Sequence, residues 1–218
     1  MAVLTVSREL GSGGRTVARK AAEILGYRFA DKKLLGEILG EYGLVEFPRE
    51  YEESRGFWDY FDTRGEAMVE MLNRAILAVA ATDEVVILGR GCFALLRGYE
   101  DVVNARIQAP FAERARRVAA RDGYEEAAKA EDYVRKADKA RRSFVEQVYG
   151  LRWGDAEPFD LVVDTAKVDA ETAASWLVEA VGVVEARPSE GGRRVSRIEV
   201  DPTLAEAVEE AFAKAEEA

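Results

Sequence analysis

Short apolar runs and longer mixed segments alternate along this chain. Five short runs, largely apolar, are typical of buried strands, and they fall at residues 2–6, 27–31, 84–91, 102–109 and 159–165. The segments between them place apolar residues three and four positions apart, which is typical of amphipathic helices. Strands separated by helices predict an α/β protein with a parallel five-stranded sheet and helices on both faces.

Several polar residues mark expected helix boundaries. Thr63 and Glu66 form a capping-box pattern at the start of one helix. A long charged helical region is expected within residues 110–149. Asp169 is placed to cap the next helix, for which Gly182 is the expected end.

Two segments fall outside this pattern. Residues 41–62 contain seven of the chain's twenty aromatic residues and many carboxylates, which favours an insertion or a partner surface over a core element. Residues 183–218 predict a hairpin followed by an acidic helix from about Pro202. We therefore expect a main domain, residues 1–182, and a C-terminal extension.

Composition restricts the classes of function. The net charge of −10 argues against a general nucleic-acid binder. No apolar run approaches the ~20 residues that a membrane helix needs, and no signal peptide is expected. The single cysteine, Cys92, excludes a disulfide framework, favours a reducing cytoplasm and is expected to be a small buried apolar residue. The absence of histidine excludes Ser-His and Cys-His nucleophile pairs and His-based metal sites.

A glycine-rich stretch, SRELGSGGRT, lies between the first strand and the first helix. The backbone N–H groups of such a loop point at one site beside a helix N-terminus, where they can hold phosphate. In the register of the phosphate-loop pattern G-x-x-x-x-G-K-[ST], the second glycine and the threonine are present. Glu9 stands in place of the first glycine, and Arg15 in place of the lysine. An ordinary glycine-rich turn between strand and helix explains the same residues equally well.

Three further stretches, together with this loop, resemble the cytidylate kinases. They are VVILGRG with the strand and Arg-rich helix after it, DKARR, and FDLVVDTAKVDAET. The four pieces follow in the family's order and cover about residues 2–181. The chain is most similar to the divergent cytidylate kinase-like proteins, which open with the same Ser-Arg-Glu and Gly-Ser-Gly-Gly-Arg run. It departs from the cytidylate kinases at Glu9 and Arg15, and it has Gly91 where they carry Asp after Gly-Arg.

For the phosphate donor, the resemblance implies a P-loop NTPase-like fold with an ATP site on the glycine loop. Arg15 would neutralise the phosphates, and the Thr16 hydroxyl would reach Mg²⁺. Arg116 and Arg117 would border the ATP base. Thr16 is alternatively an ordinary residue of the first helical turn. The loop residues concerned are Gly11, Ser12, Gly13, Gly14, Arg15 and Thr16.

For the acceptor, the resemblance implies a site at the end of a central strand, where open α/β sheets bind ligands. Arg90 would grip the acceptor's phosphate, and Asp31 would contact the nucleoside, with residues 41–62 as an insertion on the acceptor side. A surface ion pair is the alternative for Arg90, and helix capping is the alternative for Asp31.

A lid-like region is implied at residues 112–149. Asp138 would border the substrate phosphates, and Arg141 and Arg142 would close over the transferring phosphoryl group, where positive charge matters more than a strong base. The same residues also fit a solvated helix face with mixed ion pairs.

The predicted function is ATP-dependent phosphoryl transfer to a nucleoside monophosphate, with CMP as the expected acceptor. Two alternatives stay open: a catalytically weak nucleotide-binding sensor, and a protein-interaction module on the same fold. Nucleotides are the expected partners, without nucleic acid or membrane. Residues 41–62 or the C-terminal extension would supply a homodimer surface.

Overall fold

A computed structural model describes residues 2–42 and 63–216. Its five strands are β1 Val3–Arg8, β2 Arg28–Ala30, β3 Val85–Leu88, β4 Val102–Gln108 and β5 Leu161–Asp164. Its helices are α1 Gly14–Leu25, α2 Lys32–Glu41, α4 Thr63–Ala81, α5 Cys92–Leu95, α6 Phe111–Asp122, α7 Ala127–Tyr149, α8 Ala170–Ala186, the 3₁₀ turn η2 Val195–Arg197, and α9 Pro202–Glu216. Most of the predicted insertion, residues 43–62, lies outside the described residues.

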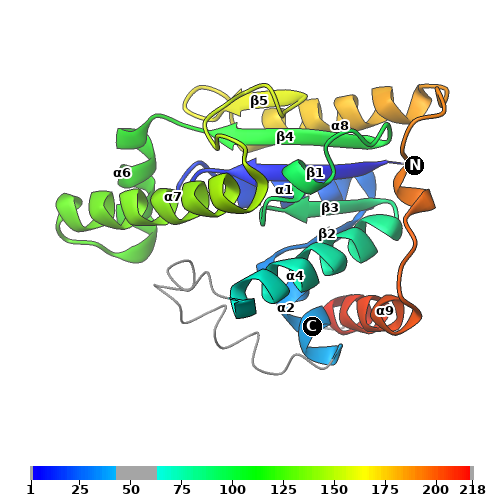
Figure 1. The fold of residues 1–218 in the computed structure, drawn as a ribbon. Coiled ribbons are helices and arrows are strands. Elements are labelled where there is room, and N and C mark those ends of the chain that lie inside the picture. The colour runs from blue at the N-terminus through cyan, green and yellow to red at the C-terminus, as the bar shows by residue number, and fades with distance from the viewer. Residues whose placement is uncertain (1, 43–62, 217–218) are drawn as a thin grey trace.

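The sheet confirms the predicted architecture. Its strand order is β2-β3-β1-β4-β5, and every neighbouring pair is parallel (Figure 1). The central strand β1 pairs with β3 on one side and β4 on the other, as in Leu4↔Val86 and Leu4↔Val103. Because all strands run the same way, the loops after β1, β3, β4 and β5 meet at one edge of the sheet.

Alternate residues of each strand face opposite layers, and each layer has its own core. One layer packs α1 and α8 against side chains such as Leu4, Val6 and Val103. The other packs α2, α4, α5 and α9 against side chains such as Val3 and Ile87. Strands β1, β3 and β4 are almost entirely buried, which confirms that helices cover both faces of the central sheet, whereas the edge strand β5 leaves Val162 exposed.

Helices α6 and α7 form an antiparallel pair that projects beyond the carboxyl edge of the sheet (Figure 1). Val118, Ala130 and Val134 form a small core of their own between the two helices. Gly123 ends α6 in the left-handed conformation, with φ +71°, which divides the single charged region expected from the sequence into two helices.

The structure corrects the prediction for the C-terminal segment. Helix α8 continues through Gly182 to Ala186, and no hairpin forms within residues 183–201. This segment instead crosses the amino edge of the sheet, where Arg193 forms an isolated parallel bridge with Tyr99. The Arg193 carbonyl oxygen accepts from the Glu100 N–H and the Val195 N–H donates to Asp101, so these backbone groups do not pair within a hairpin. The predicted last helix is present as α9, which packs on α2 and α4.

None of the helices in the described part of the chain combines the length and the apolar character that a membrane crossing requires.

Candidate active site

The glycine loop connects the end of β1 to the first turn of α1. Gly13 caps α1 in the left-handed conformation, with φ +76°, and no side chain caps the helix. The first turn of a helix leaves its N–H groups without intrahelical acceptors. Within the described residues, no acceptor is found for the N–H groups of Gly13, Gly14, Arg15 and Thr16. The loop therefore offers several adjacent donors at the positive end of a helix dipole, as an anion site requires.

Close approaches explain two of the glycines, and open space explains a third. A Cβ on Gly11 would lie 2.6 Å from the carbonyl oxygen of Arg114, and one on Gly14 would lie 2.5 Å from Cβ of Arg8. A Cβ on Gly13 would meet no atom within 4 Å. Gly11 and Gly14 thus let the loop pack onto its neighbours, whereas a side chain at Gly13 would project into open space and would be strained by the positive φ.

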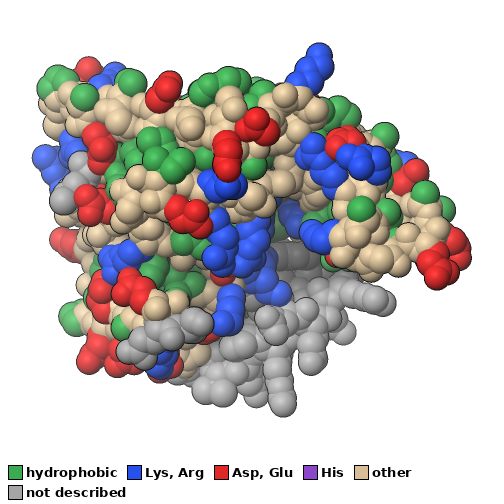
Figure 2. Space-filling view, turned by 180° about the vertical axis from the view of Figure 1, so that it is seen from behind, with side chains coloured by type: hydrophobic (Ala, Val, Ile, Leu, Met, Phe, Trp, Pro, Cys, Tyr) green, Lys and Arg blue, Asp and Glu red, His purple; other side chains and the backbone are tan. Residues whose placement is uncertain are grey.

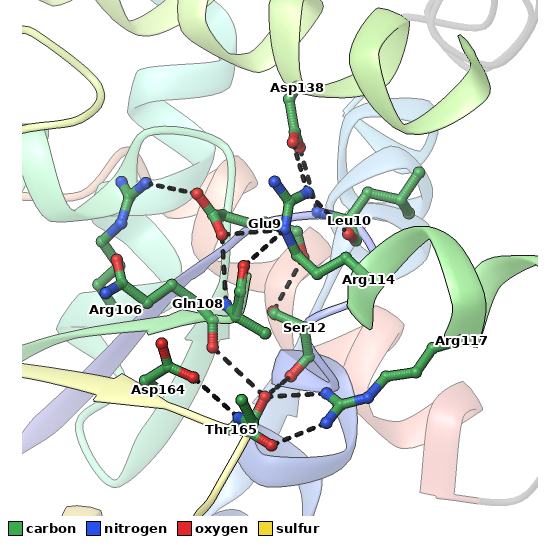
Figure 3. Close-up of polar contacts among 12 residues, drawn as sticks. Glu9, Leu10, Ser12, Arg106, Gln108, Arg114, Arg117, Asp138, Asp164 and Thr165 are labelled. Carbon is green, nitrogen blue, oxygen red and sulfur yellow. Dashed lines mark hydrogen bonds and ion pairs between the residues drawn. The ribbon is translucent and has the colours of Figure 1, made fainter. Parts of the chain in front are cut away.

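The glycine loop is held in place by a hydrogen bond to Thr165, the residue that follows β5. The buried Ser12 hydroxyl donates to the carbonyl oxygen of Glu9 at 2.9 Å, and the Thr165 hydroxyl donates to the carbonyl oxygen of Ser12 at 2.6 Å (Figure 3). Arg117 then donates to both the hydroxyl and the carbonyl oxygen of Thr165, at 3.0 and 2.7 Å. Arg117, predicted to border the ATP base, therefore lies beside the glycine loop. Arg116 instead points to solvent and pairs with Glu113.

Glu9, which replaces the first motif glycine, is the centre of a buried ionic network (Figure 3). Its carboxylate lies 3.3 Å from Arg106 Nη2 and 3.2 Å from Arg114 Nε, and it accepts a hydrogen bond from the Ala109 N–H. The arginine side chains are only 4% and 7% exposed. Burial lowers the pKa of the Arg106 guanidinium, and Glu9 opposes that shift. The carboxylate thus balances two buried cations next to the loop.

Asp138 joins helix α7 to the same loop. One of its oxygens accepts a hydrogen bond from the Leu10 N–H at 3.2 Å, and the other lies 2.5 Å from Arg114 Nη1. Arg114 also donates to the Leu10 carbonyl oxygen at 3.1 Å. Both backbone groups of Leu10 are therefore tied to the Asp138–Arg114 pair, which fixes α7 relative to the glycine loop. In this structure Asp138 acts as a positioning residue.

Arg141 lies one turn after Asp138 and faces the sheet edge. Its Nη1 is 3.5 Å from Asp138 Oδ1, and the side chain is 29% exposed. Burial lowers the pKa of Arg141, the nearby charge of Arg90 lowers it further, and Asp138 opposes both effects. Arg90 and Arg141, from different elements, are therefore close enough to repel one another. Arg142, the next residue, lies on the exposed face of α7.

Positive charge therefore gathers at the carboxyl edge of the sheet. Figure 2 shows Lys and Arg side chains beside a hollow between the body of the molecule and the projecting α6–α7 pair. Arg90 occupies a left-handed conformation, with φ +58°, between Gly89 and Gly91. A Cβ on Gly89 would overlap the guanidinium of Arg8 at the end of β1. The backbone after β3 thus packs directly against cationic side chains.

Gly91, where the cytidylate kinases carry Asp, is packed against Tyr149. A Cβ at position 91 would overlap the Tyr149 ring, and Gly91 has φ +71°. The Tyr149 hydroxyl donates to Asn73 Oδ1 on α4 at 2.7 Å. A tyrosine therefore fills the space that an aspartate side chain at position 91 would enter.

Arg15 and Asp31, predicted to bind different substrates, form an ion pair at 2.6 Å. Asp31 also caps α2, accepting from the N–H groups of Lys33 and Leu34, as the capping alternative predicts. Thr16 is exposed in the first turn of α1. Among the described residues there is no cluster of carboxylates and thiols that would hold a metal by itself. One hydroxyl fits Mg²⁺ that is bound mainly by substrate phosphates and water.

The comparisons with known proteins agree with this geometry. A sequence model of the cytidylate kinase-like family matches residues 3–167. The chain belongs to the cytidylate kinase-like family. A relative named cytidylate kinase, from Pyrobaculum aerophilum, is 31% identical over 176 residues, which span 79% of this chain and 89% of the relative. Membership of this family supports nucleotide kinase activity.

Two solved structures show the same fold as this member of the cytidylate kinase-like family. An uncharacterized protein of Eubacterium ventriosum has a TM-score of 0.67 at 23% identity, covering 86% of this chain and 100% of its own. A shikimate kinase of Bacteroides thetaiotaomicron has a TM-score of 0.52 at 14% identity, covering 83% of this chain and 98% of its own. The fold is that of the P-loop kinases.

Sequence reasoning missed the network below the loop. The resemblance brought together residues that the structure also places at one edge, among them Arg15, Arg90 and Arg141. It did not identify Arg106 or Arg114 as partners of Glu9. A signal for Arg106 was available, because an arginine in the apolar run VVNARIQ must find a counter-charge if the strand is buried.

Proposed function

We propose that this protein transfers the γ-phosphoryl group of ATP to a pyrimidine nucleoside monophosphate, with CMP preferred to UMP. The observation that carries the proposal is the set of N–H groups without acceptors among the described residues at the start of α1, at the same edge of the sheet as a group of Lys and Arg side chains. A donor phosphate needs such N–H donors, and a transferring phosphoryl group needs nearby positive charge. Membership of the cytidylate kinase-like family supports the choice of CMP.

On the donor side, the N–H groups of residues 13–16 would bind the β- and γ-phosphates. Arg15 would turn from Asp31 to the phosphates, where its planar guanidinium can contact two oxygens at once. Arg117 would lie at the border of the ATP base, next to Thr165. Bound Mg²⁺, reached by the Thr16 hydroxyl, would neutralise charge on the phosphate oxygens.

On the acceptor side, Arg90 would hold the phosphate of the monophosphate, and Asp31 would contact its nucleoside. An oxygen of that phosphate attacks the γ-phosphorus, and the bond from the γ-phosphorus to the bridging oxygen breaks, so that ADP leaves. Arg141 and Arg142 would stabilise the charge spread over the transferring group, with Asp138 holding the helix that carries them. This chemistry depends on position and charge, so a chain without histidine can perform it.

A panel of nucleoside monophosphates tests the proposal. The purified protein is incubated with Mg·ATP and, in separate reactions, CMP, UMP, AMP and GMP, and ADP formation is measured. We expect turnover with CMP, less with UMP and little with the purines. Turnover with AMP or GMP alone would contradict the assignment of CMP as acceptor. It would still support kinase activity. ATP binding without turnover on any acceptor would favour a nucleotide sensor. In that case Arg15→Lys, which restores the lysine of the motif, is the first variant to assay for turnover.

A further inference from the structure

A second cationic cavity lies at the amino edge of the sheet, away from the glycine loop. It has a volume of about 550 Å³ and is lined by Tyr99, Arg193, Arg194, Arg197 and Glu199, among others. In Figure 1 the segment that follows α8 lies at the end of the sheet where β1 begins. The glycine loop lies at the other end of β1, on the order of 20 Å away for a six-residue strand.

The backbone around this cavity is fixed by two carboxylates. Glu100 accepts hydrogen bonds from the Gly192 N–H at 2.5 Å and the Ser189 hydroxyl at 3.0 Å. These bonds, that of Gly192 first, lower the pKa of Glu100. Asp101, which is 3% exposed, accepts from the Val195 N–H with both oxygens, at 3.0 and 3.2 Å. The arginines that follow in the chain are thus presented from a rigid base.

The arginines of the cavity are only partly neutralised. Arg194 Nε lies 3.3 Å from Asp101 Oδ2. Arg193 lies over the Tyr99 ring, 4.3 Å from its centroid, and donates to the Tyr99 hydroxyl at 2.8 Å. The exposed Arg197 side chain makes no ion pair or hydrogen bond with any described residue. Among residues 2–42 and 63–216, the guanidinium groups of Arg193 and Arg197 thus have no carboxylate partner, although the whole chain has a net charge of −10.

We propose that this cavity binds a phosphate group, carried either by a nucleotide or by a free polyphosphate. A guanidinium group can contact two phosphate oxygens at once, and Arg193 and Arg197, from one short segment, both line this cavity without an ion pair to a carboxylate of the described residues. The volume is within the range of small-molecule sites. The Tyr99–Arg193 stack supplies a flat surface on which a base can lie. Glu199, which also lines the cavity, would oppose the binding of an anion, so the phosphate must sit nearer the guanidinium groups.

Calorimetry tests this site apart from the donor loop. Inorganic pyrophosphate and a non-hydrolysable ATP analogue are titrated into the Gly13→Val variant, in which a side chain projects into the space where the donor phosphates would bind. Combining that change with Arg193→Ala and Arg197→Ala should weaken binding of at least one probe tenfold or more. Arg152→Ala, which removes an arginine that is 83% exposed and paired with Asp155, is the matched control and should bind as the parent does.

The outcomes separate the two sources of phosphate. Equal affinity for both probes means that the phosphate group alone is recognised, and tenfold tighter binding of the analogue identifies a nucleotide. Absence of binding in the Gly13→Val protein, or affinities unchanged by the double substitution, would overturn the proposal. If the double variant melts early, Arg197→Gln alone decides, because it removes only the charge of an exposed side chain. Unchanged affinity for both probes in the Arg197→Gln variant would also overturn the proposal. None of these readouts depends on kinase turnover.

Discussion

Arg15 and Asp31 form an ion pair at 2.6 Å that joins the first turn of α1 to the cap of α2. The Arg15 side chain is 58% exposed and that of Asp31 is 9% exposed. In this ion pair, Asp31 binds the Arg15 guanidinium, which is the cation that the glycine loop would present to a phosphate. Under the proposed function, a donor nucleotide would compete with Asp31 for Arg15.

Replacing Asp31 by Asn should tighten the binding of Mg·ATP in the absence of acceptor. Asn removes the charge that competes for Arg15, and it still caps the helix. Exposed ion pairs contribute roughly 0.5–1 kcal/mol, so the dissociation constant should fall about two- to fivefold. Calorimetric titration measures this. Weaker binding in Asp31→Asn would mean that Asp31 orients Arg15 for the phosphate instead of withholding it.

Asp31→Ala separates the cap from the charge. It removes the acceptor of the Lys33 and Leu34 N–H groups as well as the ion pair. We expect a loss of about 1 kcal/mol in the free energy of unfolding relative to Asp31→Asn, with the same gain in ATP affinity. Denaturant unfolding of the two variants gives the comparison. Equal stability would show that the cap contributes little.

Gly13→Val should abolish Mg·ATP binding. The added side chain projects into the open space beside the loop N–H groups, where the proposed donor phosphates would bind. In the native protein, ATP at 100 times its dissociation constant should stabilise the fold by about 2.7 kcal/mol. Gly26→Val is the matched control, because Gly26 ends the same helix with a similar φ of +70° and equally open space. A thermal-shift assay should show stabilisation by ATP in Gly26→Val and none in Gly13→Val. The same response in both variants would contradict phosphate binding at the loop beside Gly13.

Arg141→Ala should reduce kcat by roughly 10³-fold and change ATP affinity only a few-fold. The charges of Arg141 and Arg90 act on one another, and in the proposed mechanism Arg141 would stabilise the charge spread over the transferring phosphoryl group. Arg141→Lys should restore little, because an ammonium group cannot make the two-pronged contact. Arg135→Ala, on the same helix with a side chain 65% exposed, is the control and should keep native kinetics. Equal losses of ATP binding and turnover in Arg141→Ala would instead identify a ligand of the ground-state phosphates.

The sheet could be predicted from the sequence, whereas the charge network around Glu9 could not. Buried strands and the Asp31 cap depend on local patterns, so they could be predicted. Glu9 pairs with Arg106 and Arg114, about a hundred positions away, and a single sequence contains no signal for pairing over that distance. The hairpin prediction was wrong for a related reason. The alternating residues near Val195 suggest a strand, but the backbone there bonds to Asp101 instead of to a second strand.

Cys92 should resist alkylation in the native protein. The thiol is fully buried, it contacts the Ile87 carbonyl oxygen, and burial raises its pKa to about 12. The thiolate is the reactive form, so native protein at pH 8 should react with iodoacetamide far more slowly than unfolded protein does. Mass spectrometry with and without guanidinium chloride checks this. Rapid labelling under native conditions would show that the α5 region opens readily.

Glu9→Gly restores the usual glycine of the phosphate-loop motif, and we expect it to damage the protein. It leaves the buried guanidinium of Arg106 without a carboxylate, and Arg114 with Asp138 alone. Removing one partner from a buried ion pair typically costs about 3–5 kcal/mol, because the other charge stays buried. Glu9→Gln should be similarly destabilised, since it keeps the shape and loses the charge.

Adding Arg106→Met to Glu9→Gln removes the unpaired cation and should recover part of the lost stability. Denaturant unfolding of the three variants measures these differences. Native stability in Glu9→Gly would show that the network is not needed at this position, whereas failure of Arg106→Met to recover stability would place the cost on Arg114.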